Sequence, residues 1–312
     1  MCKILATTIL FSLFISSSVF KKQEAKDYVF KRKSERKEYI NSYNKSLLLW
    51  NVPYHEEDIR TSLGNSHVII SGPKEGKPVV LLHGMDASST MWYPNIKALS
   101  KNNRVYAIDF IMEVGKSRAN QKSLSKEELV TWYNEIFNHY KLKNITIIGA
   151  SKGGWLATLL ATQKGNTIKK LALLSPAQTF QYVDDIGKAS SAVFLKLFPN
   201  KEKLENTLDV FSFYPNKINS VYKNQFYLGY KYAKSNSSFL QMQPFSDEDL
   251  KNITIPVLVI IGDHDIINTE KSLLQAKKLL PNCKTETLKN AGHFLSIDHS
   301  QITNKLLLDF LK

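Results

Sequence analysis

The sequence predicts an α/β fold, in which a mostly parallel β-sheet is flanked by helices and carries an inserted helical cap. From Val68 onward, short apolar runs alternate with helical patterns, the order expected when crossover helices join parallel strands. The alternation stops between residues 176 and 245, where aromatic residues accumulate without a run typical of a buried strand. An insertion at that point lies over the carboxyl edge of the sheet. We therefore expect residues 51–175 and 246–312 to form the core and residues 176–245 to form the cap.

The composition is that of one large folded domain with an N-terminal addition. With 312 residues, of which 43% are hydrophobic, the chain has ample material for a single core. The net charge of +14 comes from scattered Lys and Arg residues without an aromatic-interleaved basic motif, so no nucleic-acid partner is expected. Cys2 and Cys283 lie far apart and lack the neighbouring histidines of a metal site, so neither a disulfide framework nor a metal is predicted.

The first segment, residues 1–20, is predicted to be a signal peptide or a membrane anchor. Its uncharged stretch from Ile4 to Phe20 is typical of an export signal or a short anchor. The basic residues that follow oppose translocation and favour an uncleaved anchor with the domain on the cytoplasmic face. We expect the protein to be exported or membrane-anchored, with membrane association through residues 1–20.

Residues 21–50 are predicted to be a basic helical lead-in to the domain. The stretch 27–49 has the pattern of a charged helix laid on the domain surface, and a helix lying on a membrane surface is the alternative. Its expected packing residues are Tyr28, Phe30, Tyr39, Ile40, Tyr43 and Leu47.

Two helices of the core have their own sequence signals. Ser125 and Glu128 form a capping box that opens a helix. The last helix carries Ile302, Leu306 and Phe310 at a period of four.

A predicted strand at residues 145–148 runs into Gly149-Ala150-Ser151-Lys152-Gly153, the G-x-S-x-G form of a nucleophile elbow. A serine on so tight a strand-to-helix turn has a strained backbone, and side chains two residues to either side would collide. Gly149 and Gly153 avoid both collisions. The helix that follows directs its N-terminus toward the serine and favours negative charge there. Ser151 is therefore a candidate nucleophile.

Other parts of the predicted active site follow three more predicted strands. After residues 79–82 comes His83-Gly84-Met85, which places the Met85 N–H beside that of Lys152 as a predicted oxyanion hole. Residues 257–261 lead into a loop with two candidate acids, Asp263 and Asp265. His293 follows a strand-like run and supplies an imidazole. The order serine, acid, histidine differs from the chymotrypsin and subtilisin orders.

With these motifs, the chain resembles the α/β-hydrolases, and more narrowly the bacterial carboxylesterases of that superfamily. The resemblance covers about residues 40–312 and rests on segments 46–50, 67–73, 82–84, 88–96, 105–109, 174–177 and 289–293. It implies the α/β-hydrolase fold, with Ser151 as nucleophile, His293 as general base and acid, and Asp265, rather than Asp263, as the orienting carboxylate. Lys152 departs from the family, where this residue is usually uncharged. We expect it to be a solvated charge with a modest attraction for acidic substrates.

The expected activity is that of a serine hydrolase that cleaves small-molecule carboxylic esters of short to medium acyl chains. Ser151 attacks the ester carbonyl while His293 takes its proton, and the acyl-enzyme is then hydrolysed without any cofactor. His83 is expected to be a structural hydrogen-bonding residue and not a base, and His264 an exposed loop residue and not a metal ligand. The alternatives are a peptidase, C–C hydrolase, lipase or acyltransferase with the same triad, or a non-catalytic hydrolase-like receptor.

Overall fold

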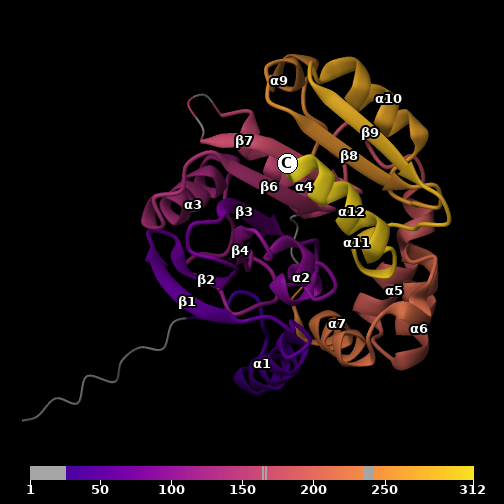
Figure 1. The fold of residues 1–312 in the computed structure, drawn as a ribbon. Helices are drawn as coiled ribbons and strands as arrows, with labels where there is room; N and C mark the ends of the chain where they lie inside the picture. The colour runs from indigo at the N-terminus through magenta and orange to yellow at the C-terminus, as the bar shows by residue number, and fades with distance from the viewer. Residues whose placement is uncertain (1–25, 164, 166, 235–241) are drawn as a thin grey trace, which may run out of the picture.

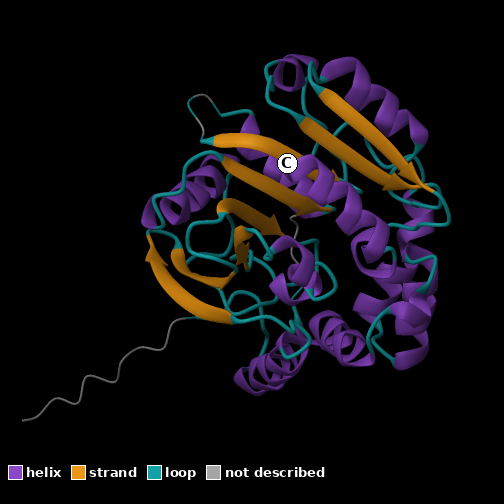
Figure 2. Ribbon diagram, in the orientation of Figure 1, coloured by secondary structure: helices purple, strands orange, loops and turns teal. Residues whose placement is uncertain are grey.

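The computed structural model describes residues 26–163, 165, 167–234 and 242–312, and contains one β-sheet with helices on both faces (Figures 1 and 2). Eight strands lie in the order β1-β2-β4-β3-β6-β7-β8-β9, and the short β5 pairs with β2. The strands are β1 (Tyr54–Thr61), β2 (Gly64–Ser71), β3 (Lys77–Leu82), β4 (Asn103–Ile108), β5 (Arg118–Ala119), β6 (Ile145–Ala150), β7 (Ile168–Leu174), β8 (Val257–Gly262) and β9 (Cys283–Leu288). The α/β architecture predicted from the sequence is confirmed.

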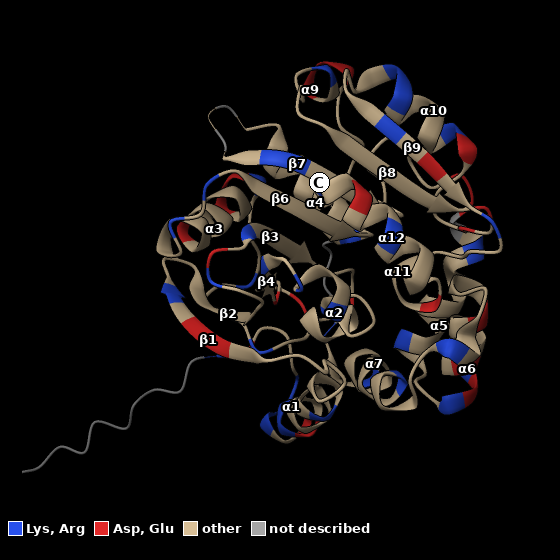
Figure 3. Cartoon of the chain, viewed as in Figure 1, with Lys and Arg blue, Asp and Glu red and all other residues tan. Residues whose placement is uncertain are grey.

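Most of the sheet is parallel. The pairs from β4 through β9 are parallel, whereas β1 with β2 and β2 with β4 are antiparallel. Every residue of β6 and β8 is buried, as expected for central strands that are covered on both faces. These two strands carry no charged residue, while Lys, Arg, Asp and Glu lie on the outer helices and on other strands, β1, β7 and β9 among them (Figure 3).

Two hydrophobic cores lie on opposite faces of the sheet because strand side chains alternate. In β6, Ile147 belongs to one core and Ile148 to the other. The first core is covered by α3 (Lys126–His139), α4 (Lys152–Ala161), α9 (Asp247–Lys251) and α10 (Glu270–Leu279). The second is covered by α1 (Lys33–Leu47), α2 (Ile96–Leu99), α11 (Leu295–Asp298) and α12 (Ser300–Leu311).

The predicted capping box at the start of α3 is present, because Ser125 Oγ accepts from the Glu128 N–H and the Glu128 carboxylate accepts from the Ser125 N–H. The predicted last helix is present as α12, and Leu306 and Phe310 pack against the core, but the most buried stripe lies one position further along. Ile302 is 48% exposed, whereas Leu307 and Leu311 are buried. Apolar residues occupy two adjacent stripes of this helix, and both have a period of four, so periodicity alone does not identify the inner one.

The lead-in helix α1 packs on the domain beside the cap helix α7 (Figure 1). Its buried residues include Tyr39, Tyr43 and Leu47, three of the predicted packing residues. The helix is shorter than the predicted stretch 27–49, because the Asp27 carboxylate accepts hydrogen bonds from the next backbone N–H groups and holds a turn. Because the domain covers the apolar face of α1, the structure agrees with a helix packed on the domain surface and not with a helix that lies on a membrane surface.

The predicted helical insert is confirmed between β7 and β8. Its elements are η2 (Ile186–Ala189), α5 (Ser190–Leu197), α6 (Lys201–Phe211), η3 (Pro215–Lys217) and α7 (Ser220–Tyr232). The exact domain boundaries, 176 and 245 among them, stay a prediction.

The predicted signal peptide or anchor, residues 1–20, lies outside the described residues. Among the residues that the structure does describe, no helix has the length and apolar character needed to span a membrane. Export or membrane anchoring therefore stays a prediction.

A buried histidine links β2 to β1 and makes stability sensitive to pH. Hydrogen bonds join His67 Nδ1 to Asp58 Oδ1 at 2.6 Å and His67 Nε2 to Glu56 Oε2 at 2.9 Å. Burial alone would lower the pKa of His67, but the bonds to Asp58 and Glu56 raise it to about 9. Protonated His67 therefore stabilises the fold fully below its unfolded pKa of about 6.5.

This stabilisation is lost as the pH rises through 9. We expect the free energy of unfolding, measured by urea titration, to fall by on the order of 1–2 kcal/mol from pH 6.5 to pH 9 because of His67, a figure that allows for the partly exposed carboxylates. In His67→Gln this part of the decrease should disappear. An identical pH dependence in both proteins would contradict the assignment.

Candidate active site

Ser151 lies on the sharp turn between β6 and α4 with a strained backbone, φ 52° and ψ −117°. The two glycines of the motif are required by close backbone contacts. A Cβ on Gly149 would lie 2.2 Å from the Gly153 carbonyl oxygen, and one on Gly153 would lie 2.1 Å from that of Leu82. The Ser151 N–H donates to the Leu174 carbonyl at 2.9 Å, which fixes the turn against β7. The turn thus holds the serine side chain at the carboxyl edge of the sheet.

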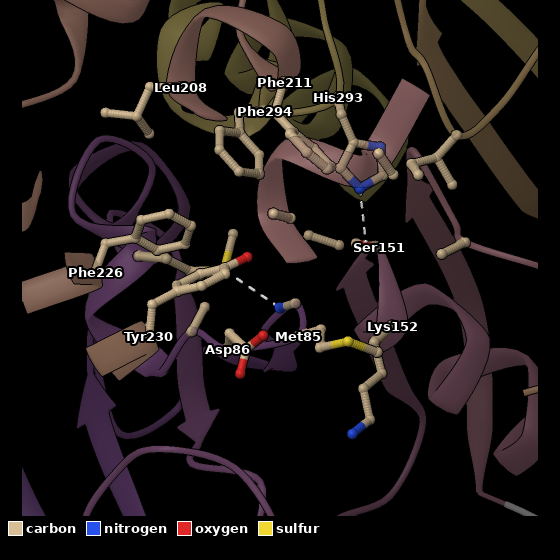
Figure 4. A pocket seen from close by; sticks show the side chains of 18 of the residues that line it. Met85, Asp86, Ser151, Lys152, Leu208, Phe211, Phe226, Tyr230, His293 and Phe294 are labelled. Atoms are coloured by element: carbon tan, nitrogen blue, oxygen red, sulfur yellow. Dashed lines mark hydrogen bonds between the residues drawn. The ribbon is translucent and has the colours of Figure 1, made fainter. Parts of the chain in front are cut away.

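Three predicted residues come together at this edge in one hydrogen-bonded row. His293 Nε2 lies 2.9 Å from Ser151 Oγ, and His293 Nδ1 lies 2.9 Å from Asp265 Oδ1 (Figure 4 shows the first bond). They follow β6, β8 and β9, three strands whose carboxyl ends meet at the same edge. The row has the geometry of a nucleophile, a base and an orienting acid.

Asp265 is buried and held ionised. Its Oδ1 also accepts from the Ile267 N–H at 2.9 Å, and its Oδ2 accepts from Asn268 Nδ2 at 3.0 Å. Burial works to raise the pKa of the carboxyl, but the attraction of His293 and these hydrogen bonds hold it below its ordinary value. An ionised Asp265 can accept a proton from His293 Nδ1, an arrangement in which Nε2 is free to take the proton of Ser151. Asn268 was not predicted from the sequence, which has no distinctive signal at this position.

Asp263, the competing acid, makes different contacts. Its Oδ1 lies 2.7 Å from His264 Nδ1 and accepts from the Ala291 N–H at 3.1 Å. Its carboxylate and the exposed His264 thus form a separate pair in the loop. The structure brings Asp265, and not Asp263, to His293.

The proposed oxyanion donors lie beside the serine. Met85 and Lys152 line the same pocket as Ser151, and a Cβ added to Gly84 would come within 3.4 Å of the Ser151 Cβ. Lys152 begins α4, where helix N–H groups have no partner within the helix and can face an anion. His83 supports this loop, since its Nε2 accepts from the Phe110 N–H and its Nδ1 donates to the Gly84 carbonyl, both at 2.8 Å. The role of Met85 and Lys152 as donors stays a prediction.

The expectation that Lys152 is a solvated charge is wrong. Lys152 is 3% exposed, and its side chain points away from Ser151 (Figure 4). Its Nζ lies 2.6 Å from Glu113 Oε1 and 4.3 Å from the centre of the Phe110 ring. The buried Glu113 carboxylate neutralises the ammonium, which removes the basis for the expected attraction of acidic substrates. Sequence reasoning missed Glu113, although a charged residue where relatives carry an uncharged one is a signal to search for a partner.

A mainly apolar cavity of about 360 Å³ opens next to Ser151 and His293. Its wall includes residues of the core and of the cap: Met85, Ala192, Val193, Leu197, Leu208, Phe211, Ile218, Tyr222, Phe226, Tyr230 and Phe294. The Phe211 ring meets that of His293 edge-on, with centroids 5.7 Å apart. The cap therefore forms one wall of the cavity and also contacts the candidate base.

A second carboxylate that the sequence did not reveal joins the cap to the core. Asp298, in α11, is buried, and its Oδ2 accepts from Ser212 Oγ at 2.5 Å and from the Phe213 and Tyr214 N–H groups at 2.9 and 3.2 Å. These three residues follow α6 of the cap, whereas α11 begins directly after the loop of His293. Asp298 thus fixes the cap next to the candidate base.

No metal site is formed by the residues that the structure describes. Within the described ranges, no three His, Cys, Asp or Glu side chains gather closely enough to form a metal site. In the catalytic row, His293 is bonded to Asp265 and to Ser151. That the reaction needs no cofactor stays a prediction.

Comparison with known protein families shows which family this chain belongs to. Residues 73–300 match the family described as "Serine aminopeptidase, S33" (Hydrolase_4). The chain therefore belongs to this family of α/β-hydrolases.

Individual relatives of this chain are carboxylesterases from Bacillus subtilis. A carboxylesterase of Bacillus subtilis, nap, is 33% identical over 282 residues, which are 87% of this chain and 91% of that protein. Carboxylesterase YbfK of the same organism is 28% identical over 88% of this chain and 93% of its own length. The crystal structure of naproxen esterase from Bacillus subtilis superimposes with a TM-score of 0.84 at 30% identity, covering 90% of this chain and 100% of that one. The α/β-hydrolase fold is thus confirmed, and the chain is a carboxylesterase-like serine hydrolase.

Proposed function

We propose that this protein is a carboxylesterase that hydrolyses esters of short to medium acyl chains with Ser151, His293 and Asp265. The observation that carries the proposal is the row of two 2.9 Å hydrogen bonds through His293, which ends on a serine at the wall of an apolar cavity. Relatives named as carboxylesterases support the same reaction class.

The reaction proceeds in two half-reactions. Ser151 Oγ attacks the ester carbonyl carbon while its proton passes to His293 Nε2, and the carbonyl oxygen becomes an oxyanion that faces the N–H groups of Met85 and Lys152. The C–O bond to the alcohol then breaks, and His293 returns the proton to the leaving oxygen. Water repeats the sequence on the acyl-enzyme and releases the acid. Ionised Asp265 stabilises the His293 imidazolium that forms in each half-reaction.

The cavity favours a neutral ester over a peptide with a free amino terminus. An aminopeptidase requires an unpaired acid to bind the substrate ammonium. Asp86 is the acid among the described residues that line the cavity, and Lys196 of α5 donates to it at 2.5 Å. This carboxylate is already neutralised by the cap.

A lipase acting on aggregated substrates is a second candidate, and the outer face of the cap favours it. Helix α5 buries Leu195 but exposes Val193, Phe194 and Leu197, and Phe198 beyond its end is also exposed. Val193 and Leu197 also line the cavity. An apolar surface at the rim of a substrate cavity is suited to contact a lipid aggregate.

The acyl-chain profile separates the two candidates. Each methylene that finds apolar wall should contribute up to ~0.8 kcal/mol, or about fourfold in kcat/KM, until the cavity is filled. We therefore expect p-nitrophenyl ester turnover to rise from acetate to butyrate or hexanoate and to fall for palmitate. A continuous rise to palmitate, with higher activity on micelles, would instead identify the lipase.

Labelling with a fluorophosphonate tests the serine hydrolase assignment directly. We expect the probe to modify the wild-type protein at Ser151 and to block ester hydrolysis in proportion to labelling. If the wild-type protein reacts with the probe, but the unlabelled protein cleaves amides or β-diketones and no ester, Ser151 remains the nucleophile and the esterase proposal is overturned. Unlabelled, inactive protein would point to the non-catalytic alternative.

A further inference from the structure

One buried carboxylate, that of Glu113, contacts both chain segments that flank Ser151 in the cavity. Glu113 lies in the loop after β4 and is 2% exposed. Its Oε1 accepts from Lys152 Nζ at 2.6 Å, and its Oε2 accepts from the Asp86 N–H at 3.1 Å. Lys152 begins α4, whereas Asp86 follows Met85 in the loop after β3. A side chain from a third loop therefore joins two segments that are distant in sequence.

These two segments are the ones that carry the predicted oxyanion donors. The pairing of β3 with β6 ends at Leu82 opposite Gly149, before either donor is reached, so the sheet alone does not fix their relative position. Asp86 has a φ of 53°, a left-handed conformation that a non-glycine residue keeps only with support from its surroundings. Two donors that must converge on one oxygen need such support to within about half an ångström.

We propose that Glu113 is a positioning residue for the oxyanion hole, holding the Met85 loop against the start of α4 so that both N–H groups face the same oxygen. The inference rests on the proposed function, because the hole has this role only if Ser151 attacks a carbonyl. It goes further in assigning part of the transition-state geometry to a residue that touches neither substrate nor triad.

The environment of Glu113 suits this role. Burial alone would raise the pKa of its carboxyl, but the charge and the hydrogen bond of Lys152 hold it below its usual value, so it stays ionised and accepts both bonds. A buried ion pair is often no more stabilising than an apolar pair of the same shape. Glu113 also accepts a bond from the backbone N–H of Asp86. The ion pair with Lys152 would be complete without this second bond, so the bond indicates a further role.

Two double variants separate positioning from charge burial. Glu113→Gln with Lys152→Met, and Glu113→Leu with Lys152→Met, both remove the two charges and keep similar side-chain volumes. Only the glutamine retains an oxygen for the Asp86 N–H. For p-nitrophenyl butyrate we expect kcat to be about 10- to 100-fold lower in the leucine double variant than in the glutamine one, with KM within about threefold.

Inhibition by ketones supplies a second readout that a merely structural role would not move. 1,1,1-Trifluoroheptan-2-one forms an adduct whose oxyanion occupies the hole, whereas heptan-2-one binds the same cavity without that charge. The leucine variant should lose affinity for the trifluoromethyl ketone in proportion to its loss of kcat and bind heptan-2-one as the glutamine variant does. Equal kcat and equal affinities in the two folded variants would overturn the inference.

A single variant covers the case in which the double variants do not fold. In Glu113→Asp the flexible Lys152 chain can follow the shortened carboxylate, but the Asp86 backbone cannot, so we again expect kcat to fall by about tenfold with KM nearly constant. A kcat equal to that of the wild type would overturn the inference. A wild-type protein that hydrolyses no ester would instead contradict the proposed function, which keeps the two failures distinct.

Discussion

Replacement of Ser151 by alanine is expected to lower kcat/KM for p-nitrophenyl butyrate by about 10⁴-fold or more while the protein stays folded. The loss follows from the 2.9 Å bond between Ser151 Oγ and His293 Nε2, since alanine leaves the base without a nucleophile to activate. The fold should tolerate the change because the substitution removes one oxygen and adds no atom. Thermal unfolding of both proteins checks that the loss is chemical.

Ser175 offers a matched control for this substitution. It follows β7, the neighbour of β6 in the sheet, and like Ser151 it has a positive φ, 46°. Its hydroxyl is buried without a hydrogen-bond partner among the described residues, so Ser175→Ala should change activity by no more than a fewfold. Retention of a tenth of the wild-type activity in Ser151→Ala, or an equal loss in both variants, would contradict the assignment of the nucleophile.

The parts of the site that the sequence predicted are those set by backbone constraints. Gly149 and Gly153 are required by contacts of 2.2 and 2.1 Å that admit no side chain, so they mark the elbow in the sequence. The sheet is equally predictable, because strands buried on both faces, such as β6 and β8, consist of uncharged residues that are apolar apart from Thr146. Since parallel strands end at one edge, the residues that follow them meet there without further information.

Side-chain partners from separate loops were not predictable in this way. Glu113 pairs with Lys152 across 39 positions of the sequence, and Asp298 accepts from backbone groups of the cap 84 and 85 positions away. No sequence motif relates such residues. The paths of the loops are not known from the sequence, so many other acids could have taken the positions of Glu113 and Asp298. Lys152 was consequently predicted to be exposed, whereas the fold buries it.

The second large effect is expected from Asp265, the acid that contacts His293 in the loop after β8. Asp265→Asn is expected to lower kcat/KM by about a thousandfold or more. An asparagine can donate its amide N–H to Nδ1, which places the imidazole proton on Nε2 and removes the lone pair that accepts the Ser151 proton. The other partners of this carboxylate, the Ile267 N–H and the Asn268 amide, lose a charged acceptor as well, so a modest loss of stability should accompany the kinetic effect.

Asp263→Asn is the matched control, since it makes the same chemical change two residues away. Its oxygen contacts His264 and the Ala291 N–H, and an amide oxygen can keep the second bond, so activity should change by no more than a fewfold. Proton NMR gives an independent measurement: the downfield resonance of a His293 Nδ1 proton shared with a carboxylate should persist in Asp263→Asn and vanish in Asp265→Asn. A larger kinetic loss in Asp263→Asn would mean that His293 takes its partner from the other carboxylate in solution, and the register of the loop after β8 would have to be reassigned.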